Sequence, residues 1–411
     1  MPPPSFFFSM VLNRRMLVAL VMGFSCGLPL SMTLSVLQAW MTDAGVDLST
    51  IGLFSLVGLP YTVKFIWAPV FDRFTLPFLG RRRGWLLVAQ LCLIGSILWL
   101  GFSNPLTHPR LLALAALAVA FCSASQDVVV DAYRREDLSD KELGMGASLY
   151  IYGYRTGMLL TSGGGLMLAD HMSFSMVYAL MAMGLIPGVI TTFLTPEPKV
   201  HTPPTTLRKA VVEPLTAYFR RPRAVWILAF ILLYKIGDTM AGAMTLPFYL
   251  DMGFSKTQIG AVVKFFGFWA IMAGAFCGGL ILLHVNIRRS LWGFGILQAL
   301  STAGFALLAV IGPSMAALSA VIAFENFTAG MGTAAYTAYM ASITDKRFTA
   351  TQYALLSSLM GIPRVVAAAP TGYLVTHLEW IGFFVLCTLI ALPGLLLIRW
   401  IDAPYESKQT P

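Results

Sequence analysis

Long apolar segments dominate this sequence and constrain its fold more than any other feature. Each is roughly 18 to 28 residues long, as a membrane-crossing α-helix requires, whereas a membrane-spanning β-strand needs only about 10 residues. Twelve segments can be marked, over residues 14–41, 50–72, 84–102, 110–133, 143–168, 174–195, 224–250, 257–283, 290–311, 314–342, 350–377 and 379–402. The pattern predicts an all-α membrane protein with twelve transmembrane helices.

The composition leaves too little polar surface for a soluble fold. Charged residues make up 11% of the chain and apolar residues 57%, whereas an ordinary soluble domain is about 25% charged. A cytosolic enzyme, a secreted domain and a disordered scaffold are therefore excluded. Residues 1–13 have no charged start and no cleavage site, so we expect no cleaved signal peptide.

The basic residues fall almost entirely on one side of the predicted membrane. With both termini in the cytoplasm, 21 of the 28 Lys and Arg residues lie in cytoplasmic segments, against two, Arg110 and Lys256, on the other side. Because basic loops stay in the cytoplasm, this bias predicts a multi-pass protein with both termini cytoplasmic. It also accounts for the net charge of +9, so we expect no nucleic-acid partner.

One long polar stretch divides the twelve segments into two groups of six. Residues 196–223 hold six prolines and six Lys or Arg residues, as a connecting segment would. We therefore predict a six-helix bundle over 1–195, a cytoplasmic linker over 196–223 and a second six-helix bundle over 224–411.

The two predicted bundles share a weak internal repeat. Charged residues recur in corresponding segments at offsets of 200, 198 and 209 residues, in the pairs Lys64/Lys264, Asp127/Glu325 and Arg155/Arg364. Transporters built from two related halves carry repeats of this kind.

The loop after the second segment carries a further motif. Asp72-Arg73 is followed by Gly80-Arg81-Arg82-Arg83. Together with the six-plus-six arrangement, this loop resembles that of major facilitator transporters and implies their fold. The resemblance also implies a gating role at the cytoplasmic side for Asp72, Arg73, Arg81 and Arg82. The alternative is that these arginines only set orientation.

Several longer stretches resemble the AmpG family of inner-membrane permeases. They are GLPL (27–30), LQAWM (37–41), IGLFSLVGLPYTVKFIWAPVFDR (51–73), GRRRGWLL (80–87), FCSASQDVVVDA (121–132), GYRTGML (153–159), LYKIGD (233–238), FEN (324–326) and TQYALLSSL (351–359). The resemblance implies proton-driven import of peptidoglycan fragments, GlcNAc-1,6-anhydro-MurNAc and its peptides, across the bacterial inner membrane. Acetyl-CoA transporters share part of this signature, so acetyl-CoA or another organic anion is the alternative substrate.

Charged side chains inside the predicted helices mark a candidate cavity, because each costs about 2.5–3.5 kcal/mol at mid-bilayer. Five are basic, namely Lys64, Arg155, Lys235, Lys264 and Arg364. Three deep ones are acidic, namely Asp127, Asp238 and Glu325. The positive surplus suits an anionic substrate, either the carboxylates of a muropeptide or the phosphates of acetyl-CoA.

The three acids are the candidate proton carriers, since the predicted spans have no histidine near their centres. We place Asp127 first, then Glu325, then Asp238. The alternative for Asp127 is a structural lock to Arg73 or Arg155. Lys235 and Asp238 lie three residues apart on one helix face, so they form either a structural ion pair or a pair that protonation of Asp238 opens.

The five basic residues are assigned to the substrate, with structural pairing as the alternative. The planar guanidinium groups of Arg155 and Arg364 suit a carboxylate. Five further polar or aromatic residues are candidates to line the cavity: Tyr150, Tyr154, Gln126, Asn326 and Gln38. Packing is the alternative for the two tyrosines.

Other classes of function fit the sequence less well. A membrane-embedded enzyme needs sizeable loops, and the chain has neither these nor the His-Glu-x-x-His, Gly-x-Ser-x-Gly or Walker A motifs. A receptor that senses a ligand without transporting it is a second alternative. We expect a monomeric transporter that contacts the lipid bilayer, an anionic substrate and protons, without a metal or cofactor.

Overall fold

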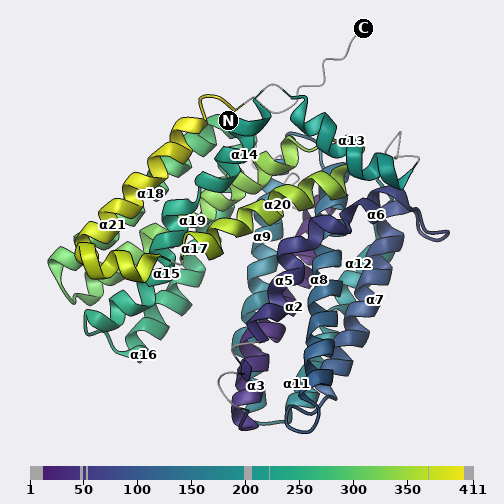
Figure 1. The fold of residues 1–411 in the computed structure, drawn as a ribbon, viewed down its shortest axis with the longest axis horizontal. Coiled ribbons are helices and arrows are strands. Elements are labelled where there is room, and N and C mark those ends of the chain that lie inside the picture. The colour runs from purple at the N-terminus through teal and green to yellow at the C-terminus, as the bar shows by residue number, and fades with distance from the viewer. Residues whose placement is uncertain are drawn as a thin grey trace. The chain divides into compact units, whose positions relative to one another are not determined.

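The structure is a computed structural model that describes residues 13–46, 50–51, 54–198, 206–221, 223–368 and 370–401. The signal-peptide expectation falls mainly on residues 1–12, outside this part. The side chain of Arg364 also lies outside it. All regular elements in the described part are helical (Figure 1), and the only β-type pairing there is an isolated bridge between Leu76 and Gly80.

The first six predicted segments all lie on helices. The elements are α2 (Arg14–Ser31), η1 (Met32–Val36), α3 (Leu37–Asp43), η2 (Phe54–Gly58), α5 (Leu59–Val63), η3 (Lys64–Ile66), α6 (Ala68–Arg73), α7 (Arg81–Gly101), α8 (Pro109–Asp137), α9 (Leu143–Leu159), η4 (Leu160–Gly164), α10 (Gly165–Ala169), α11 (Phe174–Met183) and α12 (Ile186–Leu194). Segments one, two, five and six are each divided into several helical pieces.

Further helices follow α12 along the chain. They are α13 (Leu207–Phe219), α14 (Ala224–Leu233), α15 (Ile236–Asp251), α16 (Lys256–Ile259), η5 (Gly260–Phe266), α17 (Gly267–His284), α18 (Ile287–Ile311), α19 (Met315–Ser342), α20 (Thr349–Val366) and α21 (Thr371–Leu397). Over the described residues, nine helical stretches are long and apolar enough to cross a membrane by themselves. The chain is therefore a multi-pass membrane protein.

The boundary between the last two predicted segments coincides with a break inside α21. Glu379 has φ 57° and ψ 175°, which no helix contains. The part of α21 before Glu379 belongs to the eleventh predicted segment, and the part after it forms the twelfth. Helix α21 is continuous by its hydrogen bonds, but it covers parts of two predicted segments.

The predicted linker contains a helix, which its many prolines did not predict. Helix α13 runs through Pro214, although proline in a helix interior removes one hydrogen bond and normally ends or bends the helix. The carbonyl oxygen of Pro214 accepts a hydrogen bond from Nε2 of Gln352 at 3.1 Å, which ties α13 to the start of α20.

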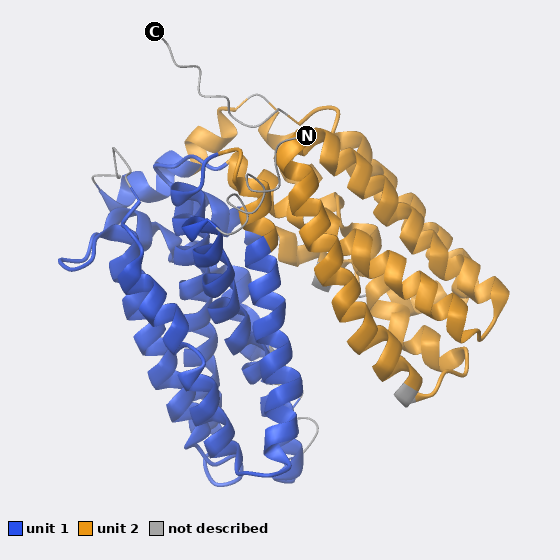
Figure 2. Ribbon diagram, turned by 180° about the vertical axis from the view of Figure 1, so that it is seen from behind, with its two compact units in different colours: residues 1–139, 149–214, 344–358 blue, residues 140–148, 215–343, 359–411 orange. Residues whose placement is uncertain are grey.

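The chain divides into two compact units (Figure 2). Unit 1 comprises residues 1–139, 149–214 and 344–358, and unit 2 comprises residues 140–148, 215–343 and 359–411. The predicted domain boundaries at residues 195 and 224 remain a prediction.

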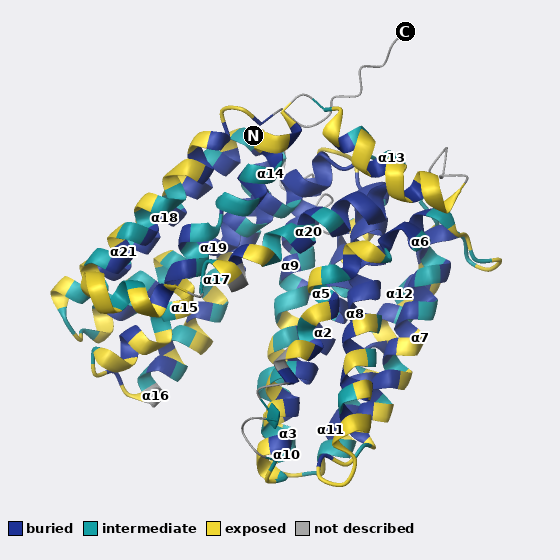
Figure 3. Cartoon of the chain, viewed as in Figure 1, coloured by how far each residue is buried: buried dark blue, intermediate teal, exposed yellow. Residues whose placement is uncertain are grey.

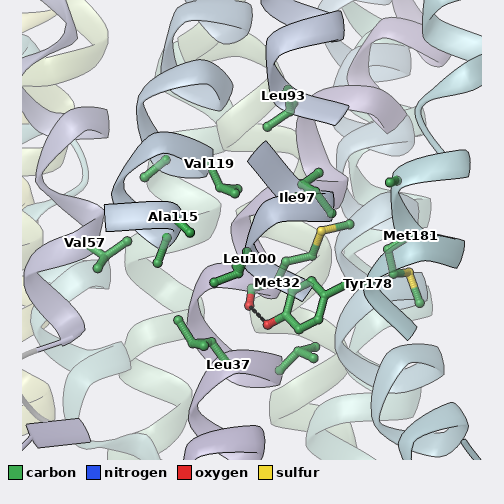
Figure 4. Close-up of a cluster of buried hydrophobic side chains, with 14 of the residues drawn as sticks. Met32, Leu37, Val57, Leu93, Ile97, Leu100, Ala115, Val119, Tyr178 and Met181 are labelled. Carbon is green, nitrogen blue, oxygen red and sulfur yellow. Dashed lines mark hydrogen bonds between the residues drawn. The ribbon is translucent and has the colours of Figure 1, made fainter. Parts of the chain in front are cut away.

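Each unit has its own apolar core. In unit 1, residues such as Met32, Leu37, Ile97 and Tyr178 are buried together, and the Tyr178 hydroxyl donates to the carbonyl oxygen of Met32 at 3.0 Å (Figure 4). The core of unit 2 is built largely from aromatic rings, among them Phe248, Phe305, Phe383 and Phe384. These cores fix the helices that carry the charged side chains.

Helices α2 and α9 approach each other at backbone distance. A Cβ atom added at Gly27 would lie 2.0 Å from the carbonyl oxygen of Tyr154, and one at Gly153 would lie 1.9 Å from that of Leu20. Small residues permit this approach in membrane helices. The contact positions Tyr154 and its neighbours against the first helix of unit 1.

Candidate functional site

A buried ion network lies where the second helical segment ends. Nη2 of Arg82 donates to Oδ1 of Asp72 at 2.7 Å and to Oε1 of Glu136 at 2.6 Å, and none of these three side chains is exposed. Nη1 of Arg82 donates to the carbonyl oxygen of Phe71 at 3.0 Å. Arg81 adds a second cation, with its Nη2 2.9 Å from Oε1 of Glu136. Two cations and two anions therefore balance inside the protein.

Asp72 also caps the start of helix α20. Its Oδ2 accepts hydrogen bonds from the backbone N–H and the hydroxyl of Thr351, at 2.8 and 2.7 Å. Its Oδ1 accepts from the N–H of Ala350 at 3.2 Å. The first N–H groups of a helix have no partner within the helix and attract negative charge. Asp72 thus binds both Arg82 and a helix that follows it by almost 280 residues in the chain.

The structure brings together three of the four predicted gating residues. Asp72, Arg81 and Arg82 share the network, whereas Arg73 is half-buried with its guanidinium 5.3 Å from the centre of the Phe74 ring. Sequence reasoning missed Glu136, because it stands among charged residues that read as an orientation signal.

The partners on α20 that sequence reasoning missed belong to one motif, TQYALLSSL over residues 351–359. Its first three residues are Thr351, Gln352 and Tyr353. Thr351 binds Asp72, Gln352 binds Pro214, and the Tyr353 hydroxyl lies 3.0 Å from Nη2 of Arg134.

A second cluster in unit 1 surrounds Asp127 on helix α8. Asp127 and Lys64 are 6% and 7% exposed, and Lys64 acts electrostatically on Asp127. The thiol of Cys26 is within hydrogen-bond reach of Asp127. One carboxylate oxygen of Asp127, Oδ1, is buried with no hydrogen-bond partner among the described residues. The cluster thus combines a buried lysine with a buried, incompletely bonded carboxyl group.

Gln126 and the two tyrosines lie around this cluster. Gln126 is fully buried, and its Nε2 donates to Sγ of Cys26 at 3.5 Å. The ring centres of Tyr150 and Tyr154 are 6.0 Å apart. The guanidinium of Arg134 lies 4.6 Å from the centre of the Tyr150 ring, so one face of this ring contacts a cation.

Unit 2 also holds a cluster of a lysine and carboxyl groups, at a break in the predicted segment 224–250. Helix α14 ends at Leu233 and α15 begins at Ile236, so Lys235 lies at the junction and Asp238 in the first turn of α15. Nζ of Lys235 lies 3.5 Å from Oδ2 of Asp238 and donates to the hydroxyl of Thr333 at 3.1 Å. The N-terminal end of a half-helix favours the negative charge of Asp238.

Glu325 on helix α19 completes this second cluster. Its carboxyl group faces that of Asp238 within hydrogen-bond reach, and Lys235 lies near enough to act on it electrostatically. Beyond Asp238 there is a hollow of about 10 Å³, bordered also by Gln298 and Thr302. That is the threshold size for one water molecule.

The other candidates take different positions. Lys264 and Gln38 are exposed and Arg155 is half-buried on α9. Nδ2 of Asn326 donates to the carbonyl oxygen of Ile322 in its own helix at 3.1 Å. The side chain of Arg364 is outside the described part. The lysine close to Glu325 is therefore Lys235. The 200-residue offset in the sequence instead pairs Lys64, which lies near Asp127, with Lys264.

Comparison with known proteins identifies the fold. Residues 19–368 match the Major Facilitator Superfamily. The proton:xylose symporter XylE has a TM-score of 0.70 at 10% identity, with 97% of this chain and 96% of that chain covered. The Escherichia coli fucose:proton symporter FucP also has a TM-score of 0.70, at 12% identity, with 95% and 99% covered.

Two curated relatives narrow the family. The anhydromuropeptide permease of Escherichia coli K12 is 44% identical over 387 residues, which are 93% of this chain and 79% of that protein. A putative transporter, AmpG 4, of Rickettsia felis is 31% identical over 401 residues, 95% of this chain and 97% of that protein.

These helices and charged clusters define a membrane transporter of the major facilitator superfamily. The sequence resemblance stated above is confirmed at the level of the family. The chain belongs to the AmpG family of permeases.

Proposed function

We propose that the chain imports anhydromuropeptides, GlcNAc-1,6-anhydro-MurNAc and its peptides, from periplasm to cytoplasm by proton symport. The relative that is 44% identical over 93% of the chain bears the name anhydromuropeptide permease, which supports this substrate class. In the proposal the protein is a monomer of the bacterial inner membrane with both termini in the cytoplasm, and it works by alternating access.

The facing carboxyl groups of Glu325 and Asp238 are the single observation that carries proton coupling. The two carboxyl groups lie close enough to share one proton in a hydrogen bond. Lys235 offsets one negative charge, so one proton on the pair leaves the cluster neutral. Binding and release of that proton therefore changes the net charge of the cluster by one.

Although the sequence favoured Asp127, we now propose the Glu325–Asp238 pair as the first candidate for the proton carrier, because its two carboxyl groups lie within hydrogen-bond reach of each other. Lys64 and Asp131 both act on Asp127 electrostatically, and its side-chain hydrogen bond is to the thiol of Cys26. In the proposal, Asp127 and Lys64 respond to the substrate in unit 1, while Glu325 and Asp238 carry the proton in unit 2.

Basic side chains supply the substrate contacts in this proposal. We assign Lys64, Arg155, Lys264 and Arg364 to the peptide carboxylates of the muropeptide and Tyr154 to its sugar. The Tyr150 face next to Arg134 is occupied by that cation, so Tyr154 is the better candidate of the two.

Uptake of a labelled anhydromuropeptide into right-side-out vesicles tests the proposal. Uptake should accumulate substrate against its gradient and collapse with an uncoupler. Glu325→Gln should abolish accumulation but leave exchange of internal for external substrate, because exchange needs no net proton movement. Asn326→Asp, next to it but turned toward Ile322, is the positional control. Accumulation by the Glu325→Gln protein would contradict the assignment of the proton.

A competition series tests the substrate class separately. Unlabelled anhydro-disaccharide should displace the labelled muropeptide, and coenzyme A should not. Displacement by coenzyme A alone would move the proposal to acetyl-CoA, and ligand binding without uptake would indicate a receptor.

A further inference from the structure

Helix α13 presents three adjacent rows of side chains that differ in exposure and polarity. Residues four apart lie on one helix face, so each row runs along the helix axis. The first row is buried and comprises Ala210, Pro214 and Tyr218. The second is exposed and apolar and comprises Val211, Leu215 and Phe219, which are 40%, 38% and 58% exposed. The third is exposed and comprises Arg208, Val212, Thr216 and Arg220.

The second row does not pack against the protein, because the first row occupies the side of the helix that does. Figure 3 shows α13 as largely exposed along its length. Leaving Phe219 and Leu215 in water is unfavourable by roughly 25 cal/mol per Å² of apolar surface. An apolar row bordered on one side by protein and on the other by basic residues is typical of a helix that lies in a lipid interface.

The contacts of the first part of α13, residues 207–214 of unit 1, agree with such an interface. Gln352, which binds the carbonyl oxygen of Pro214, lies in the first turn of α20. The same turn is bonded to Asp72 at the end of α6 and to Glu136 at the end of α8. Helix α13 is therefore attached at the level where membrane-crossing helices end, and these ends carry the basic loops.

The basic residues of α13 indicate what its exposed apolar row binds. Arg208, Lys209 and Arg220 are exposed at the two ends of the helix. The cytoplasmic leaflet carries anionic phospholipids, and each nearby Lys or Arg increases partitioning onto such a surface about fivefold. We propose that α13 lies in the cytoplasmic face of the bilayer, with Val211, Leu215 and Phe219 among the acyl chains and the basic side chains on anionic phosphate groups. This inference does not depend on the transported substrate.

Spin labels on adjacent rows test the placement in the full chain. Leu215→Cys is the probe and Thr216→Cys is its matched control, each in a background with alanine at Cys92, Cys122 and Cys277. In vesicles containing phosphatidylglycerol, the label at 215 should collide several-fold more with oxygen than with an aqueous nickel reagent. The label at 216 should show the reverse.

Three outcomes would overturn the proposal. Equal access of the nickel reagent to both labels would place the helix in water. Shielding of the 215 label from both reagents would place it against protein. Equal depth in neutral and anionic vesicles would remove the role of charge, which Arg208→Gln with Arg220→Gln should otherwise reduce by about fivefold per side chain.

A second measurement avoids the cysteine replacements. Phe219→Trp adds one indole to the native chain, and its fluorescence relative to the parent should be quenched by brominated phosphatidylglycerol. Absence of added quenching would contradict the insertion of Phe219 even if the labelled variants failed to fold.

Discussion

Asp72 and Arg82 form an ion pair that excludes water, with 2.7 Å between Oδ1 and Nη2 and no exposure of either side chain. Taking a charge out of water costs several kcal/mol unless partners compensate it. Here Arg82 has two carboxylates and Asp72 has a guanidinium and the start of a helix. Because each member of the network has several partners, loss of one leaves the others uncompensated.

Arg82→Met should therefore destabilise the protein by about 3–5 kcal/mol, the cost of leaving buried charges unpaired. Thermal unfolding of the detergent-solubilised protein would measure the change. Arg73→Met is the control from the same loop, and since Arg73 is half-buried over Phe74 it should cost about 1 kcal/mol or less. Equal shifts for the two variants would contradict the network.

Asp72→Asn keeps an acceptor for the first N–H groups of α20 but removes one of the two carboxylates that compensate the buried Arg82, so it should destabilise the protein by about 3–5 kcal/mol. If this contact acts as a gate, the Asp72→Asn protein should lose uptake even under conditions in which it remains folded. Thr351→Val removes the hydroxyl bond to Asp72 but keeps the backbone bond, so its effect should be smaller. A larger loss of uptake in Thr351→Val than in Asp72→Asn would refute the capping role.

Lys235 and Asp238 should show strong coupling in a double-mutant cycle. Lys235→Met leaves two facing carboxyl groups without their cation, whereas Lys235→Met with Asp238→Asn removes one negative charge as well. The double variant should therefore be less destabilised than the sum of the single ones, by about 0.5–3 kcal/mol. Additive unfolding energies would show that the two side chains act independently.

Gly153→Ala should force α2 and α9 apart, since the new Cβ would lie 1.9 Å from the carbonyl oxygen of Leu20. Overpacking of this kind costs about 1–3 kcal/mol. Gly95→Ala is the matched control, because nothing lies within 4 Å of its added Cβ, and alanine favours the helix by up to about 1 kcal/mol. The sign of the two changes in unfolding temperature should therefore differ.

Some site residues could be identified from the sequence because burial of charge is costly in a membrane. Lys64, Asp127, Lys235, Asp238 and Glu325 lie inside apolar segments, and the structure groups them into two clusters. The predicted pair of Lys235 and Asp238 is confirmed at 3.5 Å, although Lys235 lies at the junction just before α15 and not within the helix. The facing of Glu325 and Asp238 could not be predicted, because it depends on how α15 and α19 are packed.

The sequence by itself determined the membrane-crossing helices and the family, because apolar length and local motifs are properties of contiguous residues. Even the division near Glu379 followed from where apolar character is interrupted. The tertiary structure alone decided which distant residues meet: Asp72 with Thr351, Arg82 with Glu136, and Glu325 with Asp238. Such contacts arise from packing between helices far apart in the chain, which no local pattern encodes. For the same reason only the structure showed that the proline-containing linker forms α13, whose rows of side chains differ in what covers them.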